Sequence, residues 1–213
     1  NRLKCDLASL PHLDLLHPSR RILGHRLENS RLQTLEAEVL GVFREGDIDG
    51  WEIPQRYFDW LKQRDGRLLE SIFEHNKLDV ISMATLTAHL AEILCARWDL
   101  QNSSAHDYLA AARLLFKRRE AERAGRILDV FDENPATDEL SAISKKELAF
   151  LYKRTGRWEK ATQIWQELLE MTPADFSAVS EMAKWLEHRA RDYEAAKTLV
   201  ENALNRNSGF SSD

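Results

Sequence analysis

The sequence predicts a mainly α-helical protein, and three observations support this fold class. Glycine accounts for 8 and proline for 5 of the 213 residues, so few positions favour tight turns. Hydrophobic residues make up 43% and charged residues 31%, which is typical of globular proteins and excludes the disordered class. Apolar residues also recur at helical spacing over much of the chain, and no apolar run approaches the length of a membrane span.

The first predicted elements are a strand and a helix. Residues 10–17 form a short apolar segment that is bunched rather than periodic and is closed by Pro18, so a buried strand ending in a turn is expected. Residues 30–40 follow with leucine and valine at helical spacing, with Ser30 as the expected N-cap and Gly41 as the end.

The rest of the first hundred residues reads as a loop and two further helices. Glycine and proline among acids predict a loop over 44–56, and a short helix is expected over 57–63. A broad apolar band over 68–96 predicts a buried helix that breaks near Asn76. Residues 102–104, Asn-Ser-Ser, are the expected linker to a second region of alanine-rich amphipathic helices.

The second region contains an internal repeat, which is clearest over residues 148–173. The spaced positions of this segment are Leu148, Ala149, Tyr152, Gly156, Trp158, Ala161, Trp165, Leu168 and Pro173. This pattern resembles a tetratricopeptide repeat, in which a small residue lets two antiparallel helices approach and glycine turns the chain between them. A fainter unit precedes it, and another follows with one extra residue and Ala190 at the glycine position. The resemblance implies three helical hairpins that either bind protein segments or act as a passive scaffold.

Two polar residues stand inside the apolar band of the first region. His75 and Asp79 are four residues apart, hence on one face of a helix and one turn from each other. A buried carboxylate is costly unless it is paired or bound to a cation, so Asp79 needs a partner. Either a divalent metal, or His75 or an arginine in an ion pair, would satisfy it.

Basic residues cluster once, although the net charge of −5 does not indicate a polyanion-binding protein overall. The cluster consists of Arg20, Arg21, His25, Arg26 and Arg31, with Glu28 as the single acid among them. It is interpreted either as a solvated helix face or as a phosphate-contacting patch in which Arg20 and Arg21 bind nucleic acid.

The segment around His75 resembles a known motif. Residues 73–82, Phe-Glu-His-Asn-Lys-Leu-Asp-Val-Ile-Ser, look like the third exonuclease motif of the DEDD superfamily of 3′-to-5′ exonucleases, which share the RNase H-like fold. In that superfamily the motif is Tyr-x-x-x-Asp or His-x-x-x-x-Asp on a helix. Here His75 takes the tyrosine spacing, and Glu74 stands at the longer spacing.

The upstream order is similar to that superfamily as well. A segment bearing Asp14 is followed by a basic turn and then by a helix that begins Ser30-x-Leu32-x-x-Leu35. Residues 1–96 therefore resemble the C-terminal half of the YprB-type group of RNase H-like proteins, which also carry tetratricopeptide repeats behind this domain. The expected fold is thus mainly α, with one or two strands of an α/β RNase H-like domain.

The resemblance implies two-metal hydrolysis of phosphodiesters. Asp79 would be one ligand of Mg²⁺ or Mn²⁺, His75 would orient the attacking water, and the substrate would be single-stranded DNA or RNA ends. The first motif, Asp-x-Glu, and the aspartate of the second have no match here and are expected upstream of residue 1, so the chain is expected to be a fragment. One carboxylate cannot hold two metal ions, and the chain alone is expected to be inactive.

Two functional hypotheses result. In the first, residues 1–100 are the C-terminal part of a metal-dependent nuclease domain and residues 105–207 are a repeat domain. In the second, the repeats are an interaction module and the first hundred residues are a degenerate remnant. Cys5 and Cys95 form no Cys-x-x-Cys pair, which favours a reducing, cytoplasmic setting.

Overall fold

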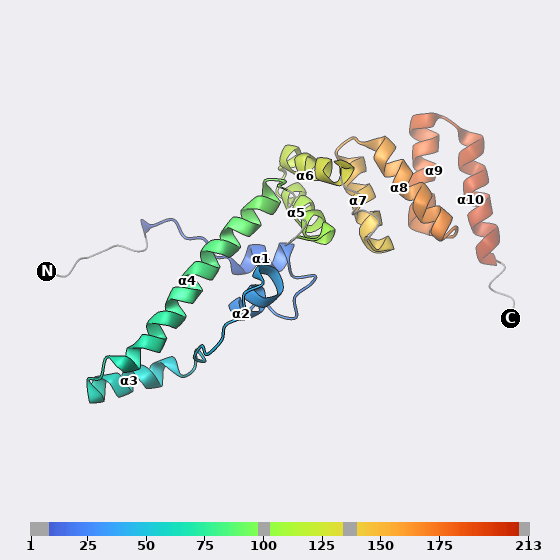
Figure 1. Cartoon of the computed structure of the whole chain (residues 1–213). Helices are drawn as coiled ribbons and strands as arrows, with labels where there is room; N and C mark the ends of the chain where they lie inside the picture. The colour runs from blue at the N-terminus through green and yellow to red at the C-terminus, as the bar shows by residue number, and fades with distance from the viewer. Residues whose placement is uncertain (1–8, 98–102, 134–139, 209–213) are drawn as a thin grey trace. The chain divides into compact units, whose positions relative to one another are not determined.

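The computed structural model describes residues 9–97, 103–133 and 140–208, and the regular elements within these ranges are helices (Figure 1). The mainly helical prediction is thereby confirmed. Backbone contacts divide the chain into two compact units, Asn1–Ala110 and Ala111–Asp213. The division falls within helix α5 (Ala105–Lys117), beyond the predicted limits of 1–100 and 105–207, which stay predictions.

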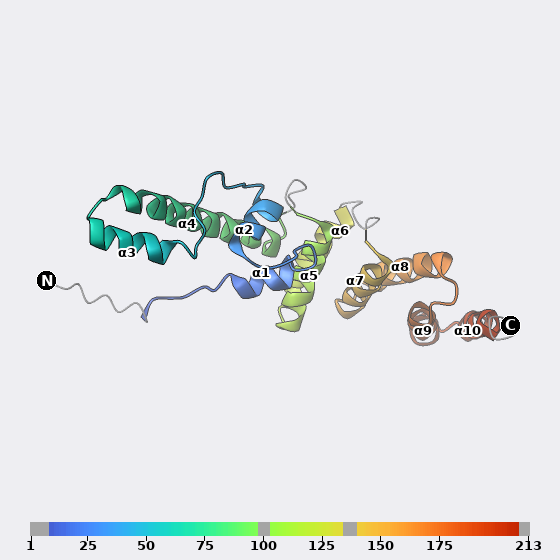
Figure 2. The same ribbon diagram turned by 90° about the horizontal axis from the view of Figure 1, so that it is seen from below.

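Helix α4 (Arg67–Leu94) is the longest described element of the first unit. Helix α3 (Ile53–Gln63) packs against its beginning as an antiparallel neighbour, as Figure 1 and Figure 2 both show. Helix α1 (Leu16–Ile22), helix α2 (Leu32–Leu35) and the π-helix η2 (Glu36–Leu40) contact α4 farther along. The first turns of α4 therefore pack against α3, and its later turns pack against the N-terminal helices.

The core of the first unit lies along one stripe of α4. Its buried apolar members include Ile22, Leu23, Leu35, Val39, Ile72, Leu86, Leu90 and Ile93. Each such side chain contributes about 1.5–3 kcal/mol when it is fully buried. The stripe, rather than intrinsic helix propensity, therefore holds α4 in place.

The strand predicted over residues 10–17 is wrong. Residues 11–14 have no regular structure, and α1 begins at Leu16, where the Asp14 carboxylate accepts the backbone N–H at 2.9 Å. Leu10 and Leu13 are exposed. A short apolar run cannot be assigned by periodicity alone, and no described segment offers the neighbouring strand whose backbone groups a strand must bond.

The helix predicted over residues 30–40 is present with a different start. It forms as α2 and η2, and it ends at Gly41, whose φ of +65° is the left-handed conformation that glycine adopts readily. Ser30 is not the N-cap, because α2 follows Arg31. Asn29 Oδ1 accepts the Arg31 N–H at 3.0 Å instead.

Two other boundaries differ from the prediction. Helix α3 begins at Ile53 rather than at residue 57, because Pro54 falls in its first turn, where the missing N–H costs no hydrogen bond. Helix α4 continues through Asn76 without the expected break.

The second unit contains helices that run back and forth. They are α6 (Ala121–Glu133), α7 (Ala142–Arg154), α8 (Trp158–Met171), α9 (Phe176–Trp185), the π-helix η4 (Leu186–Ala190) and α10 (Tyr193–Ser208). Successive helices from α7 to α10 pack against each other. Gly156 turns the chain with a φ of +82°, and Ala161 and Trp165 are buried side chains of α8. The assignment of these hairpins to tetratricopeptide repeats stays a prediction.

Within the described residues, no helix combines the length and the apolar character that crossing a bilayer requires.

Candidate active site

Five charged or titratable side chains meet beside α4, in the first unit. They are Glu36 from η2, Arg44 and Asp47 from the loop that follows, and His75 and Asp79 from α4. His75 and Asp79 lie one turn apart, with 3.6 Å between His75 Nε2 and Asp79 Oδ2. The neighbouring positions expected from their spacing are therefore present.

Arg44 is the centre of this cluster. Its side chain is 6% exposed and donates hydrogen bonds to three carboxylates. Nε donates to Glu36 Oε2 at 2.7 Å, Nη1 to Asp47 Oδ2 at 2.8 Å and Nη2 to Asp79 Oδ1 at 2.6 Å. Hydrogen bonding to Glu36 raises the pKa of the guanidinium above its ordinary value, against burial, which acts in the opposite direction. Arg44 thus remains a permanent positive charge.

The turn after η2 brings Arg44 to α4. Gly41 adopts the left-handed conformation, and the Val42 N–H bonds the Glu36 carbonyl oxygen at 2.9 Å, which closes the helix end. The chain then passes Arg44 and is anchored again where Ile48 is buried. Because both ends of this short segment are held, its polar side chains face the middle of α4.

Asp47 is the partner of His75. Its two oxygens lie 3.0 and 2.9 Å from His75 Nδ1. Burial alone would raise the pKa of the Asp47 carboxyl, but hydrogen bonds from Arg44 and His75 outweigh burial and hold this pKa below its usual value. Asp47 is therefore ionised at neutral pH.

The cluster does not fit a divalent ion as it stands. Mg²⁺ and Mn²⁺ take several oxygen ligands, and among the described residues no group of three or more His, Cys, Asp or Glu side chains is placed to hold a metal. The contacts explain why. Asp79 Oδ1 already accepts from Arg44, and the guanidinium lies where the three carboxylates converge. The acids of this chain are paired with an arginine rather than gathered around an open centre.

Three of the five residues of this cluster were not predicted from the sequence as site residues. Arg44 and Asp47 are on a loop, where no periodicity connects them with α4. Glu36 carried a readable signal, because an acid beside Leu35 and near Val39 stands on the buried face of its helix. A buried acid at this position requires a partner, but the local sequence does not identify that partner.

Comparison with known proteins relates the chain to the RNase H superfamily and to a Bacillus protein. Residues 1–91 match the family model of the RNase H superfamily. Over 200 residues, 93% of its length, the chain is 30% identical to the protein YprB of Bacillus subtilis (strain 168). These two matches support a similarity to YprB-type RNase H-like proteins. It spans 48% of the length of that relative. No solved structure matches it significantly.

The RNase H superfamily match covers α1 to most of α4, which includes the whole Arg44 cluster. It therefore assigns a nuclease-like fold to the region that carries His75 and Asp79. The second unit lies outside that match and is covered by the similarity to the Bacillus protein.

The basic cluster of the first unit contains both buried and exposed contacts. Asp107, which is fully buried, pairs with Arg26 at 3.1 Å and lies 3.4 Å from His25. Burial lowers the pKa of His25, although Asp107 opposes this. Arg20 and Arg21 remain exposed in the last turn of α1. Arg20 and Arg21 are therefore available to a ligand.

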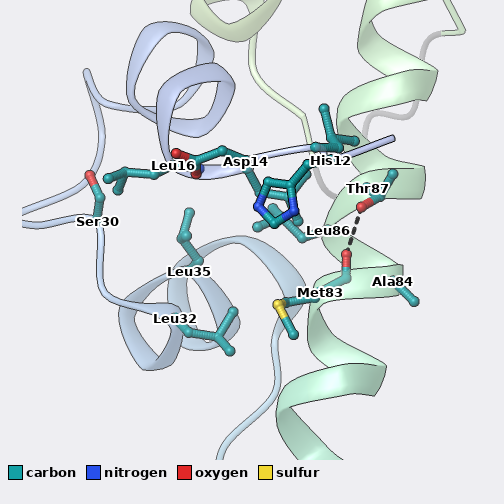
Figure 3. A pocket seen from close by; sticks show the side chains of 12 residues that line it. His12, Asp14, Leu16, Ser30, Leu32, Leu35, Met83, Ala84, Leu86 and Thr87 are labelled. Carbon is teal, nitrogen blue, oxygen red and sulfur yellow. Dashed lines mark hydrogen bonds between the residues drawn. The ribbon is translucent and has the colours of Figure 1, made fainter. Parts of the chain in front are cut away.

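A mainly apolar groove of about 520 Å³ lies on the same unit (Figure 3). Residues 12–16, α2 and α4 line it, and Met83 on its wall is one turn of α4 beyond Asp79. Ser30 also lines it and accepts a hydrogen bond from Arg20 Nε at 3.3 Å. The exposed arginine therefore lies beside the groove.

Proposed function

We propose that the chain is the C-terminal part of a metal-dependent, RNase H-like nuclease of the 3′-to-5′ exonuclease type. Its own contribution to the active site is Asp79 and His75. The observation that carries this proposal is their placement on α4. The two side chains are 3.6 Å apart, Asp79 is 33% exposed, and both lie within the region that matches the RNase H superfamily.

Asp79 would supply one oxygen ligand to Mg²⁺ or Mn²⁺. Divalent ions in nucleases generally act on the attacking water and the leaving oxygen of the phosphodiester. The other carboxylates would come from the rest of a full-length protein, since the chain spans about half of its Bacillus relative. We expect the chain by itself to be inactive, because one aspartate cannot complete such a site.

The exposure of Asp79 makes this role compatible with the Arg44 cluster. Glu36 is buried and the Asp47 side chain is 9% exposed, so neither can lose its arginine without leaving an unpaired charge in the interior. Asp79 reaches solvent, and Arg44 would keep two carboxylates after releasing it. Of the three acids, Asp79 is thus the one that can change its partner at low cost.

Nucleic acid is the proposed substrate, in the form of single-stranded DNA or RNA ends. Arg20 and Arg21 would contact backbone phosphates, which bind arginine without regard to sequence. Replacing both with glutamate in a full-length protein should weaken binding and flatten its salt dependence, as a titration with a labelled oligonucleotide at several salt concentrations would show. Unaltered binding would return these arginines to the role of a solvated helix face.

The decisive test is Asp79→Asn in a full-length protein. Asparagine keeps an oxygen for Arg44 but removes the charge that a metal needs. Metal contributions of several kcal/mol correspond to a loss of at least about 100-fold in Mg²⁺- or Mn²⁺-dependent digestion of 3′ ends. Asp49→Asn is the matched control, because Asp49 is exposed on the same loop and its carboxylate accepts the ring N–H of Trp51 at 3.0 Å. Equal digestion by both variants would refute the role of Asp79.

A second candidate is a helical-repeat interaction module. It is favoured by a groove of about 300 Å³ between α9 and α10, where Phe176, Val200 and Leu204 are partly exposed. Exposed apolar grooves of this kind suit protein segments. A full-length protein that digests no nucleic acid with either metal would favour this candidate over the nuclease.

A further inference from the structure

We propose that Asp47 is a positioning residue for His75. It holds the imidazole in the tautomer that carries hydrogen on Nδ1, and it thereby turns the lone pair of Nε2 toward Asp79. The catalytic significance of this arrangement rests on the nuclease function proposed above, whereas the tautomer itself can be measured independently.

The first support is the contact between the two side chains. Both Asp47 oxygens lie within 3.0 Å of His75 Nδ1, and the side chains of Asp47 and His75 are 9% and 11% exposed. A covered contact of this kind competes little with water. The ring nitrogen that faces the loop is therefore occupied by Asp47.

The second support is that Asp47 is itself held rigidly. Its Oδ1 accepts the backbone N–H of Ile48 at 2.8 Å, and its Oδ2 accepts from Arg44 Nη1 at 2.8 Å. Ile48 is buried and Arg44 is bonded to Glu36, so neither donor can move freely. A fixed acceptor fixes the direction of the ring that bonds to it.

The identity of the tautomer follows from the donor inventory. An ionised carboxylate accepts hydrogen bonds and has no hydrogen to give, so the hydrogen between Asp47 and His75 must belong to Nδ1. A neutral imidazole carries hydrogen on only one nitrogen. When His75 is neutral, Nε2 is therefore the nitrogen with a free lone pair.

The free lone pair is directed to the place where chemistry is proposed. Nε2 lies 3.6 Å from Asp79 Oδ2, and Asp79 is one-third exposed. Two acceptors at this separation favour a hydrogen-bond donor near both, as an attacking water would be. The reverse tautomer would place an N–H there and could not accept a proton. Asp47 thus decides which of the two roles His75 can perform.

Substitution can distinguish a tautomer-selecting contact from an ordinary ion pair. A purely structural contact would need only opposite charges, and asparagine in place of Asp47 would abolish it. A tautomer-selecting contact needs an acceptor at Nδ1, and the side-chain oxygen of asparagine can still accept there. Asp47→Asn and Asp47→Ala therefore separate the two explanations.

The test uses the 213-residue chain labelled with ¹⁵N in its histidines. Long-range ¹H–¹⁵N correlation at pH 8.5, about two units above the ordinary imidazole pKa of ~6.5, identifies which nitrogen of each ring is protonated. His75→Gln assigns the His75 signals. We expect hydrogen on Nδ1 and a free Nε2 in the unmodified chain and in Asp47→Asn, and loss of that preference in Asp47→Ala. Hydrogen on Nε2 in the unmodified chain, alone or with a second on Nδ1, would overturn the proposal.

A second measurement connects the tautomer with catalysis in a full-length protein. Asp47→Ala should lower kcat by about 10- to 100-fold with KM little changed, as loss of an orienting carboxylate commonly does, and Asp47→Asn should restore much of kcat. Equal losses in both variants would contradict positioning. Absence of any digestion would refute the nuclease function while the tautomer measurement still decides the role of Asp47. Asp49→Asn again provides the control on the same loop.

Discussion

The two units of the chain stabilise their interiors by different means. In the first, charged side chains are buried in pairs, with Glu36 against Arg44 and Asp107 against Arg26. In the second, small and aromatic residues dominate, and Ala161 and Trp165 lie almost completely covered between helices. Arg44 bonds Asp79 across 35 positions of sequence, whereas the second unit is built from neighbouring hairpins.

This difference predicts different responses to substitution. Breaking a buried ion pair leaves a charge without compensation, which costs more than the pair contributed. Packing between small residues fails by overcrowding or by loss of a turn, and each such change costs less.

Arg44→Met should destabilise the first unit most. It leaves the carboxylates of Glu36 and Asp47 buried without a counter-charge, and the expected cost is about 3–5 kcal/mol. Hydrogen exchange of peptides that cover residues 36–48 and 72–82 measures the loss locally. Arg56→Met is the control, because Arg56 and its partner Glu52 are each about one-third exposed, and removal should cost under about 1 kcal/mol. Equal costs would show that the Arg44 cluster is not a structural centre.

Glu181→Gln probes the main buried carboxylate of the second unit. Burial would raise the pKa of Glu181, but hydrogen bonds from Lys153 and Lys184 prevail and hold the pKa below its ordinary value of 4.5. A carboxyl whose pKa is depressed on folding stabilises the protein above its unfolded pKa and loses this contribution as the pH falls through the folded pKa. We therefore expect about 1–2 kcal/mol of destabilisation at pH 7 that declines as the pH falls below 4.5 and disappears below the folded pKa, as measured by urea unfolding.

The contrasting variant for Glu181 is Glu170→Gln, which alters an exposed residue of α8. It should change the free energy of unfolding by no more than about 0.5 kcal/mol. A Glu181→Gln deficit that persisted unchanged at low pH would mean that packing, and not charge, accounts for it.

Gly156→Ala should have the smallest effect. No atom within 4 Å would meet the added methyl group, so the cost comes from the backbone alone. A φ of +82° disfavours an L-residue by about 1 kcal/mol. Gly50→Ala adds a methyl group in equally open space without a left-handed φ and should be nearly neutral. Thermal unfolding of the two variants compares them directly, and equal melting temperatures would contradict the assignment of strain to this turn.

The spacing of apolar residues predicted the helices better than it predicted the residues of the candidate site. Leu35 and Val39 indicated a buried helix face, and Gly41 indicated where that helix ends. Both features could be predicted because they depend on residues close together in the sequence. The spacing of His75 and Asp79 likewise placed them together on α4. The identity of their partners did not follow, since Arg44 and Asp47 reach α4 only through a loop whose path depends on the folded core.

The incorrect strand prediction has a physical origin. Residues 10–17 are apolar, yet strand formation needs a neighbouring strand that no local pattern reveals.

The last predicted repeat has one extra residue near Ala190. This residue lies in the π-helix η4, where bonds from residue i to i+5 give each turn one residue more than an α turn has.

The two π turns also share an ending. Each is followed by a left-handed residue and closed by a backbone bond of 2.9 Å, from Val42 to Glu36 in one case and from Asp192 to Leu186 in the other. The first has Gly41 at the left-handed position, and the second has Arg191 with a φ of +58°. The left-handed conformation thus causes no strain at Gly41, whereas at Arg191 it costs about 1 kcal/mol. Replacing Arg191 with glycine would therefore relieve this backbone strain and raise the free energy of unfolding of the protein.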